Sequence, residues 1–600
     1  MGRKSKAKKI IRQQIEAGDT ENELNANKKK SKKESEILTD GEVKKPRFKI
    51  NKKKLFGGVL ALIMLAILVA VGYLIFERAF RAEPIAKLLP AESTVALVEV
   101  NTNFDHTQLN KTFKLLAGHP EYSKESLIKF AETFFSLVYE TDVKPWLGRE
   151  VGVAYINSAK ETNAVYELYF AEVLSQTNVD KFLQRYNPVE NIYTGHKTYN
   201  VKLPGGPAFI TFLNNYLIAS SSEQAIFQLV DSQNSSNQKL YFTPQYRKVD
   251  NNLPLNRTAF VYVNFDQLSD NFLHKLPFVN TKGLSMVMVK PLLKSFDSEG
   301  AALIALDNEF AVQTFLTLKG KNSGNSSYLS FEKKYSANLA AYLPKETLAF
   351  WGGQDLESEL QKMLSTFAGG DDSSQMLVDQ ILQSYTQKYF GQDTSFEQDL
   401  LPLLKNEFAF SIEKNKNKNI YKLIFGLETA QTDTVKLHQL ASNFANYGGI
   451  FEPKVVEHTL PDGTVGREIV AAPEEITKIE NSYNDTMIYE LKMGKQNWSV
   501  YYAIVNDFAV ICNDLDSIKV TVDLMKGNGE SLISTERFSS NIQPVIKGSD
   551  EVSFFDLEGI LPLIFKQKVI PPALGMISSF SSGKNYFEDG VVTINYLHIK

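Results

Sequence analysis

The sequence predicts an α+β fold: two tandem, duplicated units of mainly antiparallel sheet with helices on one face, preceded by one transmembrane helix. Three observations predict it. They are a long uncharged segment near the N-terminus, two stretches with similar patterns in the same order, and short apolar strands interleaved with helical segments. With 43% hydrophobic and 11% aromatic residues among 600, the chain has ample material for packed cores.

The first element is an uncharged apolar run of 22 residues, Leu55–Phe76. At ~1.5 Å per residue it can cross a hydrocarbon core of ~30 Å. Lys52, Lys53 and Lys54 precede it, whereas the flank after it is nearly neutral. The positive-inside rule therefore predicts a cytoplasmic N-terminus and an extracytoplasmic C-terminal region, which is periplasmic in a Gram-negative cell. The alternatives are a buried core helix, for which the run is too uniformly apolar, and a signal peptide, for which it starts too late.

The segment before this run, residues 1–54, is a basic tail. It has 18 Lys and Arg against 8 Asp and Glu, a balance of +10, which leaves 48 against 61, or −13, for the remainder. Few apolar residues offset its ordering entropy, so we expect a disordered cytoplasmic tail that also contacts anionic lipid. A nucleic-acid-binding arm is disfavoured, because no aromatic residue for base stacking precedes Phe48.

The extracytoplasmic region is predicted to consist of repeat 1, residues 77–325, and repeat 2, residues 326–600. Both open with Leu-Pro-x-Glu-Ser/Thr and an apolar strand. The shared positions are Pro90 and Glu92 in repeat 1, and Pro344 and Glu346 in repeat 2. These residues could form a ligand contact common to both repeats. We favour a structural role, in a turn whose carboxylate caps nearby amides.

Later segments of the repeats match in the same order. Tyr166, Leu168 and Phe170 line up with Tyr421, Leu423 and Phe425. Asn214-Asn215 and Asn506-Asp507 each separate two apolar strands, and such pairs tolerate the positive φ of a tight hairpin turn. The final strands, 311–319 and 591–600, are also alike. Their common order favours duplication over chance similarity among strand–turn–helix segments.

Helices are predicted between the strands. Apolar residues recur at helical spacing over 127–138 and 356–367, with a further helix near 376–389, and we expect their Met and aromatic residues to lie in the core. A Gly/Ser/Asn run at 319–327 indicates a linker between the repeats. An insertion at about 446–496 distinguishes repeat 2, so it is a candidate for a function specific to that repeat.

Motifs that carry chemistry are missing from the sequence. The seven histidines form no metal-binding spacing, and there is no nucleophile elbow, phosphate loop or dinucleotide fingerprint. We therefore predict no catalytic, cofactor-binding or metal-binding residues. The one cysteine, Cys512, allows no intramolecular disulfide, and we expect it to be a buried inert thiol in an apolar strand. So few cysteines favour a bacterial envelope protein over a large eukaryotic ectodomain.

The apolar run, the segment Leu89–Val100 and the layout of the chain carry a resemblance to known proteins. The chain resembles a group of uncharacterised bacterial proteins with a single-pass N-terminal membrane anchor and a large envelope domain of unknown function. The resemblance extends over residues 86–600 and implies no catalytic residues.

Together these patterns predict a membrane-anchored extracytoplasmic binding or scaffold protein of the bacterial cell envelope. Its expected partners are the lipid bilayer, through one helix, and an envelope protein, with no nucleic acid. One alternative is a carrier or sensor of an apolar ligand such as lipid, held between helices and a curved sheet. Another is a hydrolase whose site the sequence does not reveal, with Cys512 or a histidine near carboxylates.

Overall fold

The structure is a computed structural model, and its residues Ala82–Lys600 form one compact unit. In that part of the chain, no helix is both long and apolar enough to cross a membrane. The predicted tail at 1–54, the predicted membrane helix at 55–76 and the Gly/Ser/Asn run at 319–327 lie outside the described residues. The described residues are 83–600 without 104–105, 162–163, 204–205, 235–237, 270–271, 273–292, 294–295, 319–333, 368–371, 416–417, 448–453, 471–475, 494–497, 566–569, 571 and 588–589.

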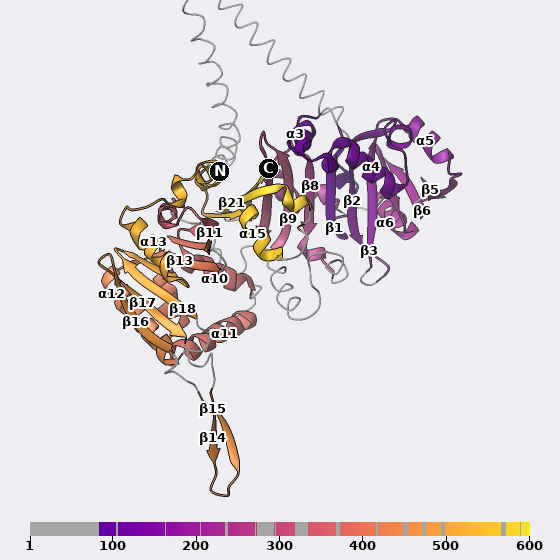
Figure 1. The fold of residues 1–600 in the computed structure, drawn as a ribbon. Helices are drawn as coiled ribbons and strands as arrows, with labels where there is room; N and C mark the ends of the chain where they lie inside the picture. The colour runs from indigo at the N-terminus through magenta and orange to yellow at the C-terminus, as the bar shows by residue number, and fades with distance from the viewer. Residues whose placement is uncertain are drawn as a thin grey trace, which may run out of the picture. The chain divides into compact units, whose positions relative to one another are not determined.

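The predicted α+β class with a large antiparallel sheet is confirmed (Figure 1). Twenty of the described strands form one sheet in which every pairing is antiparallel, and β14 and β15 form a second sheet. We call residues 83–318 half 1 and residues 334–600 half 2. The strands of half 1 are β1 (Thr94–Asn101), β2 (Leu147–Asn157), β3 (Val165–Val173), β4 (Val189–Tyr193), β5 (His196–Leu203), β6 (Gly206–Leu213), β7 (Tyr216–Ser220), β8 (Ala259–Asn264), β9 (Phe296–Ala305) and β10 (Glu309–Leu318). Those of half 2 are β11 (Thr347–Gly353), β12 (Phe408–Asn415), β13 (Lys418–Gly426), β14 (Lys454–Thr459), β15 (Val465–Val470), β16 (Ile476–Tyr483), β17 (Thr486–Met493), β18 (Trp498–Val505), β19 (Phe508–Cys512), β20 (Glu551–Asp556), β21 (Ile577–Phe587) and β22 (Gly590–Ile599).

The two halves of the large sheet have the same strand order. Half 1 runs β4-β5-β6-β7-β3-β2-β1-β8-β9-β10 across the sheet. Half 2 runs β16-β17-β18-β19-β13-β12-β11-β20-β21-β22. Each described strand of half 1 thus has a counterpart in half 2, and of the described strands only β14 and β15 have none.

The last strand of each half joins the two halves. β10 pairs with β22 in antiparallel register from Glu309 opposite His598 to Thr317 opposite Gly590. Because β10 and β22 are counterparts, this pairing relates the halves by an approximate two-fold axis at the middle of the sheet. The repeats predicted from the sequence therefore share one hydrogen-bonded sheet.

Helices cover both faces of the sheet, so the prediction of helices on one face is wrong. Successive side chains of a strand point to opposite faces. In β13, Ile424 packs in a core with Ile518 and Val522 of α13, whereas the next residue, Phe425, packs in a core with Leu437 of α12. Half 1 repeats this arrangement with α6 on one face and α5 on the other. The helices are α3 (Thr107–Leu115), α4 (Lys124–Phe135), α5 (Gln176–Gln184), α6 (Glu223–Asn234), α7 (Pro244–Asn252), α10 (Leu356–Phe367), α11 (Asp372–Phe390), α12 (Ala430–Tyr447), α13 (Leu515–Met525), α14 (Gln543–Ile546), α15 (Leu557–Phe565) and α16 (Pro572–Gly575).

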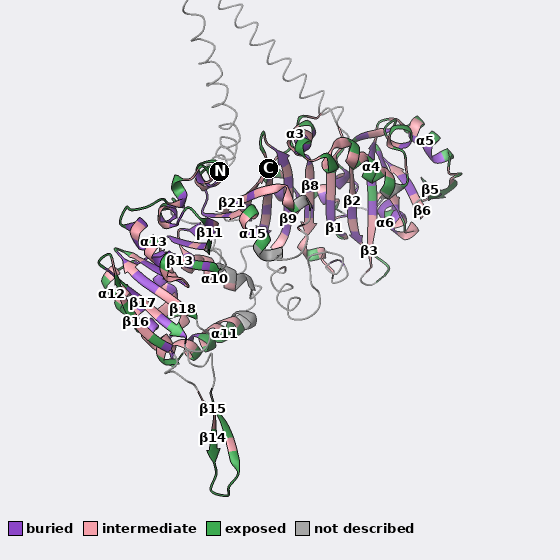
Figure 2. Ribbon diagram, viewed as in Figure 1, coloured by how far each residue is buried: buried purple, intermediate pink, exposed green. Residues whose placement is uncertain are grey.

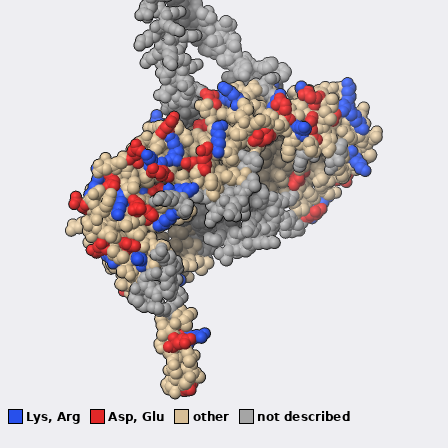
Figure 3. Space-filling view, viewed as in Figure 1, with Lys and Arg blue, Asp and Glu red and all other residues tan. Residues whose placement is uncertain are grey.

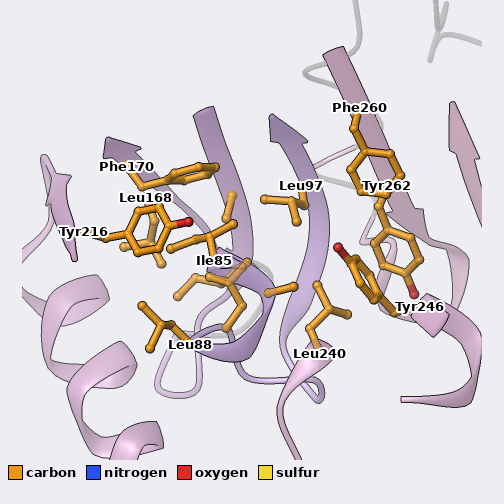
Figure 4. Close-up of a cluster of buried hydrophobic side chains, with 14 of the residues drawn as sticks. Ile85, Leu88, Leu97, Leu168, Phe170, Tyr216, Leu240, Tyr246, Phe260 and Tyr262 are labelled. Carbon is orange, nitrogen blue, oxygen red and sulfur yellow. The ribbon is translucent and has the colours of Figure 1, made fainter. Parts of the chain in front are cut away.

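The main core of half 1 shows what holds each layer in place. Leu97 of β1, Leu168 and Phe170 of β3, and Tyr216 of β7 meet Leu88 and other apolar residues of the covering layer (Figure 4). Tyr216 contacts Phe170 edge-to-face, with ring centroids 6.0 Å apart. Burying each such side chain contributes roughly 1.5–3 kcal/mol.

The predicted alignment of the third strands is wrong by one residue. In half 1, Leu97, Ala154 and Leu168 lie opposite one another across β1, β2 and β3. The equivalent row in half 2 is Phe350, Ser411 and Lys422. The counterpart of Leu168 is therefore Lys422 rather than Leu423. A one-residue slip exchanges the two faces of a strand, and the sequence match had aligned residues of opposite faces.

Two predicted helices form, but their apolar stripes are partly exposed. Phe130 of α4 is 68% exposed, and Met376 and Leu377 of α11 are 62% and 58% exposed. The expectation that these stripes are core is therefore wrong for α4 and α11. It holds for α10, where Leu356 is buried and Leu360 packs against the same core.

Candidate functional site

The repeated Leu-Pro opening forms a similar turn in both halves, which is one residue longer in half 1. Pro90 makes an isolated bridge with Lys239, and Pro344 makes one with Ser531. The hydroxyl of Thr94 donates to the Pro90 carbonyl at 2.6 Å, and that of Thr347 donates to the Pro344 carbonyl at 2.7 Å. This turn fixes where the first strand of each half begins.

The two shared glutamates of this opening, Glu92 and Glu346, are exposed. Among the described residues, the hydrogen bonds of the turn come from the threonines and the backbone, so the carboxylates are not the capping groups that the sequence suggested. Glu92 and Glu346 also lie in different halves of the sheet, so the structure does not bring them together into one site.

A buried polar cluster replaces part of the apolar core in half 2. Lys422 points into this core with a side chain that is 0% exposed, and its Nζ lies 2.7 Å from Oε1 of Glu413, which is 5% exposed. Ser517 of α13 donates to Oε2 of Glu413 at 2.6 Å. The counterparts in half 1 are apolar, since Leu168 replaces Lys422 and Ile156 replaces Glu413. The sequence carries a weak signal for this cluster, a single lysine inside the strand-like run 419–426.

Cys512 lies next to this cluster, directly opposite Lys422 on the neighbouring strand. It is 2% exposed and packs in the core of half 2, as expected for a buried thiol. Burial raises the pKa of the Cys512 thiol, and the Lys422 ammonium only partly offsets this effect. Since the thiolate is the nucleophile, this environment disfavours the reactive cysteine that a hydrolase would need.

A second charged cluster lies in half 1, at one end of β1 and β2. Burial, reinforced by the Glu150 carboxylate, raises the pKa of Glu99 to about 8 against the opposing effect of Arg257. Arg257 lies 3.1 Å from Asp250 and 3.8 Å from Glu99, and its guanidinium stacks on Phe260 at 3.7 Å from the ring centroid. A raised pKa can indicate function, but here each group has a structural partner.

A third cluster, on the other face of half 2, is centred on Glu551. Its carboxylate accepts hydrogen bonds from Trp351 at 2.7 Å, Lys584 at 3.0 Å and Tyr586 at 2.9 Å. The Lys584 ammonium and these bonds outweigh burial and hold the pKa of Glu551 below its ordinary value. Tyr586 also bonds to Glu359 at 2.8 Å and so links α10 to the sheet. Across the described residues, no three His, Cys, Asp or Glu side chains are grouped to hold a metal ion.

The clearest surface feature is the hairpin of β14 and β15, which lies inside the predicted insertion. The insertion is shorter than the predicted 446–496, because β16 and β17 are the counterparts of β4 and β5 in half 1. The hairpin turns at Asp462-Gly463, where Gly463 adopts a φ of +83° that glycine accommodates easily. The Leu460 amide donates to the Thr464 carbonyl at 2.8 Å and closes the turn.

The hairpin has an apolar face with one ion pair in its middle. Residues opposite each other in the ladder share a face. The register pairs Val455 with Ile469, Glu457 with Arg467, and Thr459 with Val465. Val455, Val465 and Ile469 are 58%, 58% and 71% exposed. Arg467 Nε donates to Glu457 Oε1 at 2.9 Å between these apolar residues.

The opposite face of the hairpin is more polar. It has His458 and Glu468, whose side chains lie 3.3 Å apart, together with Val456 and Val470. None of the hairpin residues whose burial is described is buried, and Figure 2 shows the hairpin mostly in the green of exposed residues. In Figure 3 its visible surface is mainly uncharged, with charged groups of both signs gathered over a short stretch. A two-stranded hairpin gains little stability in water without further packing, so its exposed apolar face is our candidate binding surface.

Comparison with known proteins gives a family but no function. No curated protein matches the chain. Among solved structures, crystal form I of TP0453 has a TM-score of 0.22 at 10% identity, covering 41% of this chain and 82% of that one. Crystal form IV of TP0453 has a TM-score of 0.24 at 11% identity, covering 42% and 89%. Similarity at this level carries no argument about this chain.

The family model described as "Protein of unknown function (DUF3352)" matches residues 57–448. This is more than half of the 600 residues. The sequence resemblance to uncharacterised proteins with a domain of unknown function is therefore confirmed at that level. The chain belongs to the DUF3352 family of proteins of unknown function.

Proposed function

We propose that the chain is a membrane-anchored extracytoplasmic scaffold or binding protein of the bacterial cell envelope. The observation that carries the proposal is the exposed apolar hairpin face of Val455, Val465 and Ile469, which has no apolar cover among the described residues. The uncharged run Leu55–Phe76, with lysines before it, supports anchoring by one helix with the N-terminus inside.

We also infer that the two halves arose by duplication and that half 2 has taken on the binding role. The identical strand order supports the duplication. Among the described residues, the extra hairpin is found in half 2, and half 2 has a lysine and a glutamate at core positions that are apolar in half 1. Such differences between counterparts favour a specialised second half.

Topology is tested with reporters fused after Lys600. Alkaline phosphatase folds and is active outside the cytoplasm, whereas green fluorescent protein exported by the same route does not fluoresce. We expect an active phosphatase fusion, a dark fluorescent fusion and a chain in the membrane fraction. A matched variant without Leu55–Phe76 should be soluble and have a phosphatase-inactive reporter. A fluorescent fusion with the full chain would contradict the proposal.

Binding is tested by photo-crosslinking in intact cells, with a photoreactive amino acid at single positions. We expect crosslinks to another protein chain from Ile469 on the apolar face and far fewer from Glu223 at the start of α6. Equal yields from both positions, or crosslinks to lipid alone, would contradict a protein-binding role for the hairpin.

A further inference from the structure

We propose that the partner of the hairpin is a second copy of this chain, bound through the apolar face of Val455, Glu457, Val465, Arg467 and Ile469. This inference rests on the proposed membrane anchoring, and it assigns a partner to the surface proposed above. The argument comes from the order of residues on that face.

The face is complementary to itself. Its three rows are an apolar pair, an ion pair and a row containing Val465. When two such faces stack about a two-fold axis parallel to the strands, each β14 lies over the β15 of the other copy. Glu457 of one copy then lies over Arg467 of the second copy, and Val455 lies over Ile469 of the second copy. Opposite charges and apolar groups meet without rearrangement of either hairpin.

The other arrangement of the same faces is unfavourable. With the two-fold axis perpendicular to the strands, β14 lies over β14 and Glu457 lies over Glu457 of the second copy. Like charges at such short range are repulsive. The ion pair therefore selects the arrangement in which both hairpins point the same way. On the opposite face, Val456 and Glu468 offer no comparable match.

The size of the face decides how strong the association is. Six residues per strand at ~3.4 Å give a ribbon roughly 20 Å long and about 10 Å wide, or about 200 Å². A stable dimer buries about 800 Å² per partner. The hairpins alone therefore form a weak contact, and two copies anchored in one membrane gain the effective concentration that makes it measurable.

The test uses the full chain in its membrane and places one cysteine in each of two differently tagged copies. Val455→Cys in one copy and Ile469→Cys in the other should be joined by a short bis-maleimide, because these positions face each other. The native Cys512 is 2% exposed and should not react. The matched control places Val456→Cys and Glu468→Cys on the opposite face. We expect about tenfold more linked product from the first pair than from the control.

Charge exchange makes the test specific. Glu457→Arg leaves arginine at both positions of the ion pair, and Arg467→Glu leaves glutamate at both, so each variant alone should repel itself. Copies of the two variants expressed together present opposite charges and should link again. This recovery distinguishes pairing from a hairpin that has simply failed to form.

Equal linking from both faces, no linking from either, or no recovery in the mixed charge variants would overturn the inference. The reporters fused after Lys600 are read in the same cells. If the chain is exported and membrane-bound but Val455→Cys and Ile469→Cys are not linked, only the inference is contradicted. If the chain is not exported, the proposed function itself is contradicted.

Discussion

Replacing the buried Lys422–Glu413 pair by its apolar counterparts from half 1 gives the sharpest stability prediction. Lys422 and Glu413 are 0% and 5% exposed and lie 2.7 Å apart. Lys422→Leu alone leaves the Glu413 carboxylate buried without its counter-ion. Breaking a buried pair in this way costs about 3–5 kcal/mol.

The second step replaces both members of the pair. Lys422→Leu with Glu413→Ile restores the residue types of Leu168 and Ile156 and leaves no buried charge. The hydroxyls of Ser517 and Ser411 then lose the acceptors that they have at 2.6 Å and 3.2 Å, which costs about 1–3 kcal/mol for each unpaired hydroxyl. Adding Ser517→Ala and Ser411→Ala removes both donors. The quadruple variant should therefore be as stable as the natural chain or up to about 4 kcal/mol more stable.

The assay is urea unfolding of the purified chain in detergent, followed by tryptophan fluorescence. Trp351 and Trp498 lie in half 2 and the third tryptophan, Trp146, lies in half 1, so most of the signal reports on the half that is changed. Lys422→Leu and the double variant should both unfold at lower urea concentrations than the quadruple variant. A single variant within about 0.5 kcal/mol of the natural chain would refute the reasoning, because an unpaired buried carboxylate cannot be that harmless.

Three further predictions follow from the same structure. The pKa of Glu99 is raised to about 8, so its protonated form favours the folded state. Stability should therefore fall between pH 5 and 8, and Glu99 should contribute up to about 1.4 kcal/mol per pH unit to this fall. A shallower profile for Glu99→Gln than for the natural chain would confirm it, whereas equal slopes would contradict it. Replacing 454–470 by a short Gly/Ser loop should change the free energy of unfolding by less than about 1 kcal/mol, because no residue there whose burial is described is buried. A larger loss of stability in urea titration would show that the hairpin packs against the rest of the chain. Cys512 should resist a thiol reagent in the native chain and react at once in urea, and rapid native labelling would contradict its burial.

The sequence predicts the strands and the α+β class because alternation and turn chemistry are local. Asn214 and Asn506 illustrate this: both adopt the positive φ, +50° and +54°, expected of equivalent hairpin turns. The placement of helices on two faces is not local. It depends on whether both faces of strands such as β13 are buried by helices. A short apolar run in the sequence does not show which layer covers each face.

The sequence alignment of β3 with β13 is wrong by one residue, because only the pairing with neighbouring strands fixes which residues are equivalent. Tyr421, Leu423 and Phe425 resemble Tyr166, Leu168 and Phe170, but they belong to the other face of the sheet. The buried cluster was missed for the same reason, since Lys422 looks like a solvated residue on a half-exposed strand. For the candidate surface, the sequence predicts an insertion that contains the hairpin. The ladder register is needed to show that Val455, Val465 and Ile469 share one face.

The pairing of β10 with β22 has a consequence for anyone who shortens this chain. A fragment that ends after half 1 exposes one edge of β10, because the amides and carbonyls that pair with β22 between Glu309 and Thr317 lose their partners. A fragment that contains half 2 alone exposes the edge of β22 in the same way. Long strand edges with unpaired amides and carbonyls pair with strands of other chains, so each fragment alone is expected to aggregate. Expressed together, the two fragments have complementary edges and should reassemble through β10 and β22, which makes this chain suited to split-protein complementation.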